Sequence, residues 1–332
     1  MIAWTLKKQA PIEEMPLTLE EITTPDPADH EIRIKVYACG VCRTDIHIAE
    51  GDLPLRKNPL ILGHEIVGVV DKVGKAVTSF QPGNRAGVAW LNHACGVCKF
   101  CLSGKENLCP DAAFTGWDAD GGYAEYTTLD EGFAFHLQDH VSFEELAPLM
   151  CPGIAGYRAL KLADVKRGDI VGFYGFGPTA AATLQVAKHL GVGVFAITRS
   201  QKNRDAAKEL GADWIGTYED APPSLMDAGI IFPPAGNLVE FALSQLDSDG
   251  RLVLAPVYMT PIEISDYNLI WHERSIKSLA HISRDDGREF LEIAADIDIT
   301  TQIETFPFDA LAEVLPLVKH GKIKGNAVIK VV

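Results

Sequence analysis

The sequence predicts an α/β protein that combines a β-rich half with a doubly wound parallel sheet. The first roughly 150 of the 332 residues contain short apolar runs separated by Gly and Pro turns, as in a β-rich domain. After residue 169, strand-like runs alternate with helix-like segments of about ten to fifteen residues, which indicates βαβ units. A glycine-rich turn joins the first strand of this series to its first helix. A chain of this length suits two domains.

Composition excludes several classes of protein. The chain has 45 Asp and Glu against 30 Lys and Arg, a net charge of −15, whereas a nucleic-acid-binding surface is basic. A hydrophobic content of 47% argues against disorder. There is no spanning run of about 18 apolar residues, and Lys7 follows Met1 too closely for a signal peptide. We therefore expect a cytoplasmic protein with a small-molecule substrate, without nucleic-acid or membrane partners.

Four short strands are expected in the first half, at 32–36, 67–73, 86–90 and 124–128. The first alternates apolar and charged residues, and the second is rich in β-branched residues. Ser142 and Glu145 have the spacing of a capping box, which predicts a short helix ending near Cys151.

The second half is predicted to alternate regularly. Strands are expected at 170–174, 193–197, 229–232, 251–255 and 276–280, with helices at 179–190, 202–210 and 238–246. The tail breaks this alternation, with helices at 287–295 and 310–320 and a strand at 327–331, and could return to the first domain.

Four cysteines lie close together in the sequence, at Cys95, Cys98, Cys101 and Cys109. Four thiolates in so short a segment can close tetrahedrally around one Zn²⁺ as a structural site. The alternatives are free surface thiols, disulfides or an iron–sulfur cluster.

A second, dispersed set comprises Cys42, His64 with Glu65 beside it, and Cys151. Two cysteines and one histidine with an open position are the ligand pattern of a catalytic zinc. The sequence does not show that these residues converge. Taken singly, each cysteine also fits a small buried hydrophobe, and Cys39 with Cys42 also fits a redox pair.

A dinucleotide-binding turn follows the strand at 170–174. Its pattern, G-x-G-x-x-A, ends with Ala180 and lets the backbone approach a pyrophosphate at a helix N-terminus. The residues of the turn that would contact the cofactor are Gly175, Phe176, Gly177, Pro178 and Thr179.

The next strand ends without the acid that selects NAD. Thr198 stands there, and the following polar and basic residues are Arg199, Ser200, Lys202 and Arg204. A neutral hydroxyl followed by a guanidinium favours a 2′-phosphate, which indicates NADP. The alternative is that Arg199 is a surface residue and that the site takes NAD through backbone contacts.

Together these motifs resemble the zinc-dependent medium-chain alcohol dehydrogenase family over essentially the whole chain. The residues that carry the resemblance are Gly-Val-Cys-Arg-Thr-Asp-Ile-His at 40–47, Gly-His-Glu at 63–65, the four-cysteine segment, Cys151 before Pro152, and the turn at 175–180. The resemblance implies a GroES-like catalytic domain, residues 1–152 and 284–332. A Rossmann domain, residues 153–283, would be inserted in it, with the active site between the two. It also implies a homodimer or homotetramer.

The resemblance assigns the catalytic zinc to Cys42, His64 and Cys151, with Glu65 as a transient fourth ligand and Cys39 not a ligand. Asp45 would orient His64, as metal-bound imidazoles require. The four-cysteine segment would hold the second, structural zinc.

Four further roles concern substrate and cofactor. Arg43 would approach the cofactor pyrophosphate, and Trp90 would line the substrate pocket unless it is a core residue. Thr44 would accept the substrate proton and pass it through the cofactor ribose to His47, because imidazole takes up a proton near neutral pH. The alternative for His47 is a surface histidine.

Three positions depart from the family pattern. They are Thr198 where an acid is frequent, Asn84 where the turn usually has Asp, and Ala155 where a hydroxyl often lies near the nicotinamide. None removes a zinc ligand. We expect an oxidoreductase that interconverts a primary or secondary alcohol and its aldehyde or ketone, preferring NADP(H). The alternatives are a polyol or amino-alcohol dehydrogenase, or a non-catalytic relative that binds zinc and dinucleotide.

Overall fold

The computed structural model describes residues 1–332, which divide into two compact units. The first contains Met1–Cys151, Ile282–Leu291 and Thr301–Val332, and the second contains Pro152–His281 and Glu292–Thr300. Helix α7 (Arg284–Ile297) contributes residues to both. None of the helices combines the length and apolar character needed to cross a membrane.

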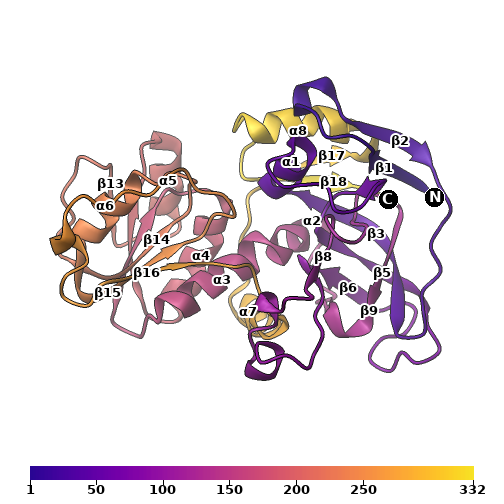
Figure 1. Cartoon of the computed structure of the whole chain (residues 1–332), viewed down its shortest axis with the longest axis horizontal. Coiled ribbons are helices and arrows are strands. Elements are labelled where there is room, and N and C mark those ends of the chain that lie inside the picture. Colours follow the sequence, from indigo (N-terminus) through magenta and orange to yellow (C-terminus); the bar gives the residue numbers. More distant parts are fainter. The chain divides into compact units, whose positions relative to one another are not determined.

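The first unit is built on a seven-stranded sheet (Figure 1). Its order is β10-β6-β5-β3-β18-β17, and β9 also pairs with β3. The strands are β3 (Glu31–Val41), β5 (Glu65–Val73), β6 (Arg85–Val88), β9 (Tyr126–Asp130), β10 (Ala134–His136), β17 (Ile303–Pro307) and β18 (Asn326–Lys330). Antiparallel pairing of β18 with β3 returns the C-terminal tail to this unit, as the broken alternation suggested.

Smaller elements complete the first unit. One sheet joins β2 (Leu17–Glu21), β1 (Ile2–Leu6) and β4 (Leu60–Ile61), and another joins β7 (Leu91–His93) and β8 (Ala113–Phe114). The helices are α1 (Arg43–Glu50), α2 (Phe143–Leu146) and α8 (Leu311–Lys319). The capping box predicted for α2 is present, because Ser142 and Glu145 exchange hydrogen bonds.

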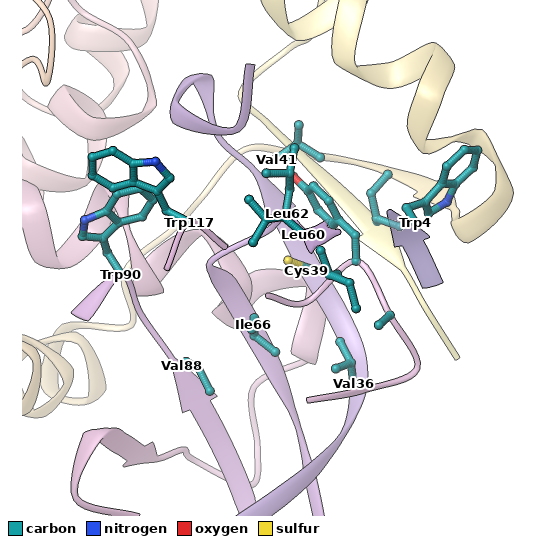
Figure 2. Packing of buried hydrophobic residues seen from close by; sticks show 14 of the residues in the cluster. Trp4, Val36, Cys39, Val41, Leu60, Leu62, Ile66, Val88, Trp90 and Trp117 are labelled. Atoms are coloured by element: carbon teal, nitrogen blue, oxygen red, sulfur yellow. The ribbon is translucent and has the colours of Figure 1, made fainter. Parts of the chain in front are cut away.

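Apolar side chains from β3, β5 and β6 form the core of the first unit. Val36, Cys39, Ile66 and Val88 are buried there (Figure 2). In β3 the expected alternation holds, because every second residue from Ile32 is buried until the last four, which are all buried. The buried end of β3 leads directly to Cys42.

The second unit is a parallel six-stranded sheet with helices around it (Figure 1). Its order is β13 (Trp214–Gly216), β12 (Gly193–Ile197), β11 (Ile170–Tyr174), β14 (Met226–Ile231), β15 (Leu246–Leu254) and β16 (Ser275–Ser278). The helices are α3 (Pro152–Ala163), α4 (Pro178–His189), α5 (Gln201–Glu209) and α6 (Leu238–Ser244). All strand pairs are parallel, which confirms the predicted doubly wound sheet.

Candidate active site

Cys42 stands at the junction of a strand and a helix. It is the N-cap of α1, directly after β3. Asp45, the third residue of the helix, accepts a hydrogen bond from the Cys42 N–H at 2.9 Å and so closes the first turn. The same turn therefore fixes the Cys42 thiol and a fully buried carboxylate.

His64 follows β4 and the residue Gly63, whose φ of +94° favours glycine. The His64 ring is fully buried, with Nδ1 3.2 Å from Asp45 Oδ1. Because a carboxylate only accepts, Nδ1 carries a proton that it donates to Asp45, which leaves Nε2 as the ring nitrogen that can bind a metal. Nε2 is buried and has no hydrogen-bond partner. An oriented imidazole with a bare buried nitrogen is suited to bind a metal.

Four side chains from three separate parts of the sequence come together at this site. They are Cys42, His64, Glu65 and Cys151, and one ligand atom from each lies within 4.8 Å of the others. Glu65 lies opposite Gly40 in the pairing of β5 with β3. A Cβ on Gly40 would lie 1.8 Å from Glu65 Oε2, so glycine leaves the space that this carboxylate occupies.

The titratable groups of this cluster shift one another's pKa values. A hydrogen bond from Cys151 holds the pKa of the Cys42 thiol well below its usual range. The same hydrogen bond, with burial, raises the pKa of Cys151, while burial and the Cys42 thiolate raise the pKa of Glu65. Burial lowers the pKa of His64, but the carboxylate of Asp45 outweighs it and raises that pKa overall. The Cys42 thiolate thus favours the protonated forms of Cys151 and Glu65. A bound divalent cation would displace these protons.

Three further predicted residues lie on α1. The Thr44 side chain is nearly buried, with Oγ1 3.6 Å from the Cys42 sulfur. His47 Nδ1 lies 2.7 Å from the Asp52 carboxylate, just after Gly51 ends the helix. Asp52 is not predicted by any sequence motif, and Gly51, a residue typical of helix ends, is the local indication of a turn that brings Asp52 back toward His47. Arg43, the first residue of α1, is exposed.

Trp90 contacts the histidine of the cluster. Its ring lies edge-on to that of His64 at 4.7 Å between centroids, and stacks with Phe114 and Trp117. Trp90 is almost fully buried and so is also a core residue. The three aromatic rings form an apolar wall beside His64.

The four predicted cysteines form a separate cluster, with all sulfur atoms within 4.8 Å of one another. No disulfide is present. The Cys98 and Cys101 sulfurs lie 3.5 Å apart, and those of Cys95 and Cys101 lie 3.9 Å apart. Tetrahedral Zn–S bonds of about 2.3 Å would give S···S distances of about 3.8 Å. Backbone N–H groups, first that of Val97, lower the pKa of Cys95 to about 7, which favours a thiolate ligand.

A carboxylate within this lobe anchors it to α7. Glu106, between Cys101 and Cys109, accepts hydrogen bonds from Arg284 Nε at 2.9 Å, Nη2 at 2.6 Å and the Arg284 N–H at 2.7 Å. No sequence pattern predicts this pair, because 178 residues separate its members.

Cys98→Ser should destabilise the protein. Loss of one thiolate would open the closed site that the four cysteines are expected to form, and a metal in such a site is coupled to folding. We expect the melting temperature to fall by several degrees, since each kcal/mol moves it by about 2–4 °C in a domain of about 150–250 residues. Differential scanning calorimetry with metal analysis checks this. An unchanged melting temperature after metal loss would contradict a structural role.

The glycine-rich turn has the predicted form in the second unit. Gly175 has φ +81°, Gly177 caps α4, and Pro178 begins the helix. A Cβ on Gly177 would meet no atom within 4 Å, so the space before the helix is open. Buried Ala180 lets the helix pack closely. This geometry presents helix N–H groups to an anion.

The residues after β12 divide into two kinds. Arg204 donates to the carbonyl oxygens of Thr198 at 2.9 Å and Arg199 at 2.7 Å, so it holds the turn together. Arg199, Ser200 and Lys202 are exposed. Arg199 and Lys202 are therefore the cations of the set that are available to a ligand.

Known proteins match the chain in both sequence and structure. The alcohol dehydrogenase GroES-like domain family matches residues 28–139, and the zinc-binding dehydrogenase family matches residues 178–296. A relative from Mycobacterium tuberculosis (strain CDC 1551 / Oshkosh), named probable alcohol dehydrogenase AdhA, is 44% identical over 99% of this chain and 97% of its own. An alcohol dehydrogenase from Geobacillus stearothermophilus is 36% identical over 98% and 99%.

A solved structure agrees with these relatives. A cinnamyl alcohol dehydrogenase from Sorghum bicolor superposes with a TM-score of 0.90 at 26% identity, over 99% of this chain and 97% of its own. Both units are thus of known type, GroES-like and Rossmann. The chain therefore belongs to the zinc-dependent medium-chain dehydrogenase/reductase family.

Proposed function

We propose that this protein is a zinc alcohol dehydrogenase that interconverts primary or secondary alcohols with aldehydes or ketones and prefers NADP(H). The observation that supports this proposal is that two thiols and a carboxylate lie close to His64, whose buried Nε2 has no hydrogen-bond partner. The alcohol dehydrogenases among its relatives support the reaction type. In this proposal residues 1–152 and 284–332 are catalytic, and 153–283 bind the dinucleotide.

Two metal ions per chain are proposed. Cys42, His64 and Cys151 would hold the catalytic Zn²⁺, with Glu65 in reach, and the four-cysteine lobe would hold the structural one. When bound, the catalytic ion supplies Lewis acidity toward the substrate oxygen. The hydride chemistry belongs to the nicotinamide, and the protein supplies position and charge.

The proton path is assigned to α1. The Thr44 hydroxyl lies beside the Cys42 sulfur, where it can accept the proton of a substrate hydroxyl and donate its own onward. His47, held by Asp52 through Nδ1, would take up this proton on Nε2 and release it to water. Arg43 would neutralise the cofactor pyrophosphate.

The aromatic wall of Trp90, Phe114 and Trp117 would make a substrate pocket beside His64 apolar, which would favour apolar or aromatic alcohols over polyols. An initial-rate panel of alcohols and aldehydes with both nicotinamide cofactors, together with metal content per chain, tests the proposal. Absence of turnover with every alcohol and aldehyde, in protein that contains metal, would contradict it.

Thr198→Asp combined with Arg199→Gln should move the cofactor preference toward NAD. The new carboxylate would repel a 2′-phosphate and accept from a 2′-hydroxyl, while the lost guanidinium removes a phosphate contact. A charge-assisted contact of about 1.5–3 kcal/mol corresponds to roughly ten- to a hundredfold in kcat/KM ratio. Arg204 stays unchanged, so the turn keeps its carbonyl contacts. Equal or higher kcat/KM with NAD in the unmodified enzyme would overturn the NADP assignment.

A further inference from the structure

Tyr123 is a buried tyrosine that the sequence motifs do not mark. Its backbone is held on both sides, because its N–H donates to Leu62 O at 3.0 Å and its C=O accepts from Trp4 N–H at 2.8 Å. Its ring packs on Gly63, where a Cβ would lie 2.9 Å from it. The side chain has no exposed surface. The Tyr123 side chain is therefore held in place against the loop that carries His64.

The Tyr123 hydroxyl completes a set of donors around Asp45. It lies 2.9 Å from Asp45 Oδ2, which also accepts from Cys42 N–H at 2.9 Å. Oδ1 accepts from His64 Nδ1 and from Gly63 N–H, each at 3.2 Å. The four donors come from the strand–helix turn, the histidine loop and Tyr123. The Asp45 carboxylate thus links the candidate metal ligands Cys42 and His64. Tyr123 donates a further hydrogen bond that holds this carboxylate in place.

We propose that Tyr123 is a positioning residue that holds Asp45 in the orientation that aims His64 Nε2 at the catalytic metal, and so raises metal affinity. The inference rests on the proposed metal site of Cys42, His64 and Cys151. Burial and the adjacent Asp45 carboxylate raise the pKa of Tyr123, which keeps its hydroxyl protonated and a donor.

The expected loss of metal affinity follows from the number of hydrogen bonds that separate Tyr123 from the metal ligand. Partners that hydrogen-bond a ligand directly contribute about 10–100-fold in affinity. Tyr123 acts one hydrogen bond further out, because it contacts Asp45 and not His64. Deleting its hydroxyl leaves Oδ2 with one donor in place of two, while the other three contacts of Asp45 remain. We expect a loss of roughly 3- to 10-fold, below the range for direct partners.

Tyr123→Phe tests this in the full-length protein, because it deletes one oxygen and keeps the ring. Co²⁺ is titrated into protein depleted of its labile metal, against a competing chelator, and the thiolate and ligand-field absorption bands are recorded. Cys42→Ser supplies the signal of the four-cysteine lobe alone. Tyr174→Phe is the matched control, since Tyr174 is equally buried and its hydroxyl lies 3.4 Å from the Ala242 carbonyl in the other unit. Asp45→Asn shows how much metal affinity is lost when the residue that hydrogen-bonds His64 directly is changed.

Support requires weaker Co²⁺ binding by 3- to 10-fold and shifted ligand-field bands in Tyr123→Phe, with Tyr174→Phe unchanged. Binding within twofold of the unmodified protein, while Asp45→Asn weakens it more than tenfold, would overturn the role of Tyr123 and leave the metal site standing. An equal loss of metal from the four-cysteine lobe would mean general destabilisation and would also overturn it. If Cys42→Ser matches the unmodified protein, the proposed site itself fails.

Discussion

Cys42→Ser is expected to abolish alcohol oxidation and to leave the fold intact. Serine keeps the shape of the side chain, and the helix start depends on Asp45, which still accepts the Cys42 N–H. A neutral hydroxyl is a poor ligand beside Cys151 and His64, so the catalytic metal should be lost. Lewis acidity contributes several kcal/mol to the transition state, which corresponds to at least about a thousandfold in turnover. Steady-state rates, metal content and circular dichroism measure the three consequences.

Cys39→Ala is the matched control for this prediction. Cys39 lies three residues before Cys42 but is fully buried in the core of the first unit (Figure 2). Its thiol is not among the side chains that come together with His64, although burial raises its pKa as it does that of Cys151. We expect this variant to keep its metal and its turnover, with a modest loss of stability. Full activity of Cys42→Ser, or loss of the catalytic metal in Cys39→Ala, would contradict the ligand assignment.

Most of the site could be predicted because its chemistry leaves local patterns. Four cysteines within one segment and a glycine-rich turn between a strand and a helix are visible without any tertiary contact. The convergence of Cys42, His64 and Cys151 was not visible in the same way. It depends on where β3 and β4 end, and it came from the family resemblance.

The partners of the site residues were the part that sequence reasoning missed. Tyr123 reaches Asp45 across 78 positions, and Arg284 reaches Glu106 across 178. No spacing rule connects such pairs, because sheet pairing and loop packing create the contact. The helix α3 (Pro152–Ala163) was also missed, since the Cys-Pro-Gly sequence at its start is typical of a turn and here begins a helix instead.

Strands were predicted best where the hydrophobic pattern was strong. Residues 170–174 and 193–197 matched β11 and β12 fully, because these central parallel strands are buried on both faces. By contrast β17 (Ile303–Pro307), at the edge of its sheet, has no fully buried residue and gave no clear pattern. The periodicity of apolar residues in a sequence reflects which side chains are buried, and it is weak where a strand is half exposed.

Thr44→Ala should reduce alcohol oxidation by about 10²–10⁴-fold, the range for loss of a general acid–base step. The Thr44 hydroxyl lies beside Cys42 and is nearly buried, so water has little access to replace it. Alanine favours the helix, and the first turn of α1 should therefore persist. Thr44→Ser keeps a hydroxyl and should retain most of the rate. A Thr44→Ala rate equal to that of Thr44→Ser would remove the hydroxyl from the proton path.

His47→Gln should cost less than Thr44→Ala, about 10-fold at neutral pH, because His47 stands at the outer end of the path, where its side chain is 19% exposed and water can partly replace it. The loss should shrink at high pH, where hydroxide accepts the proton, and imidazole buffer should restore His47→Gln but not Thr44→Ala. Single-turnover rates are required, since slow product release would hide the step. If His47→Gln oxidises alcohol at the unmodified rate across the whole pH range, His47 is a surface histidine paired with Asp52 and the proton leaves Thr44 by another route.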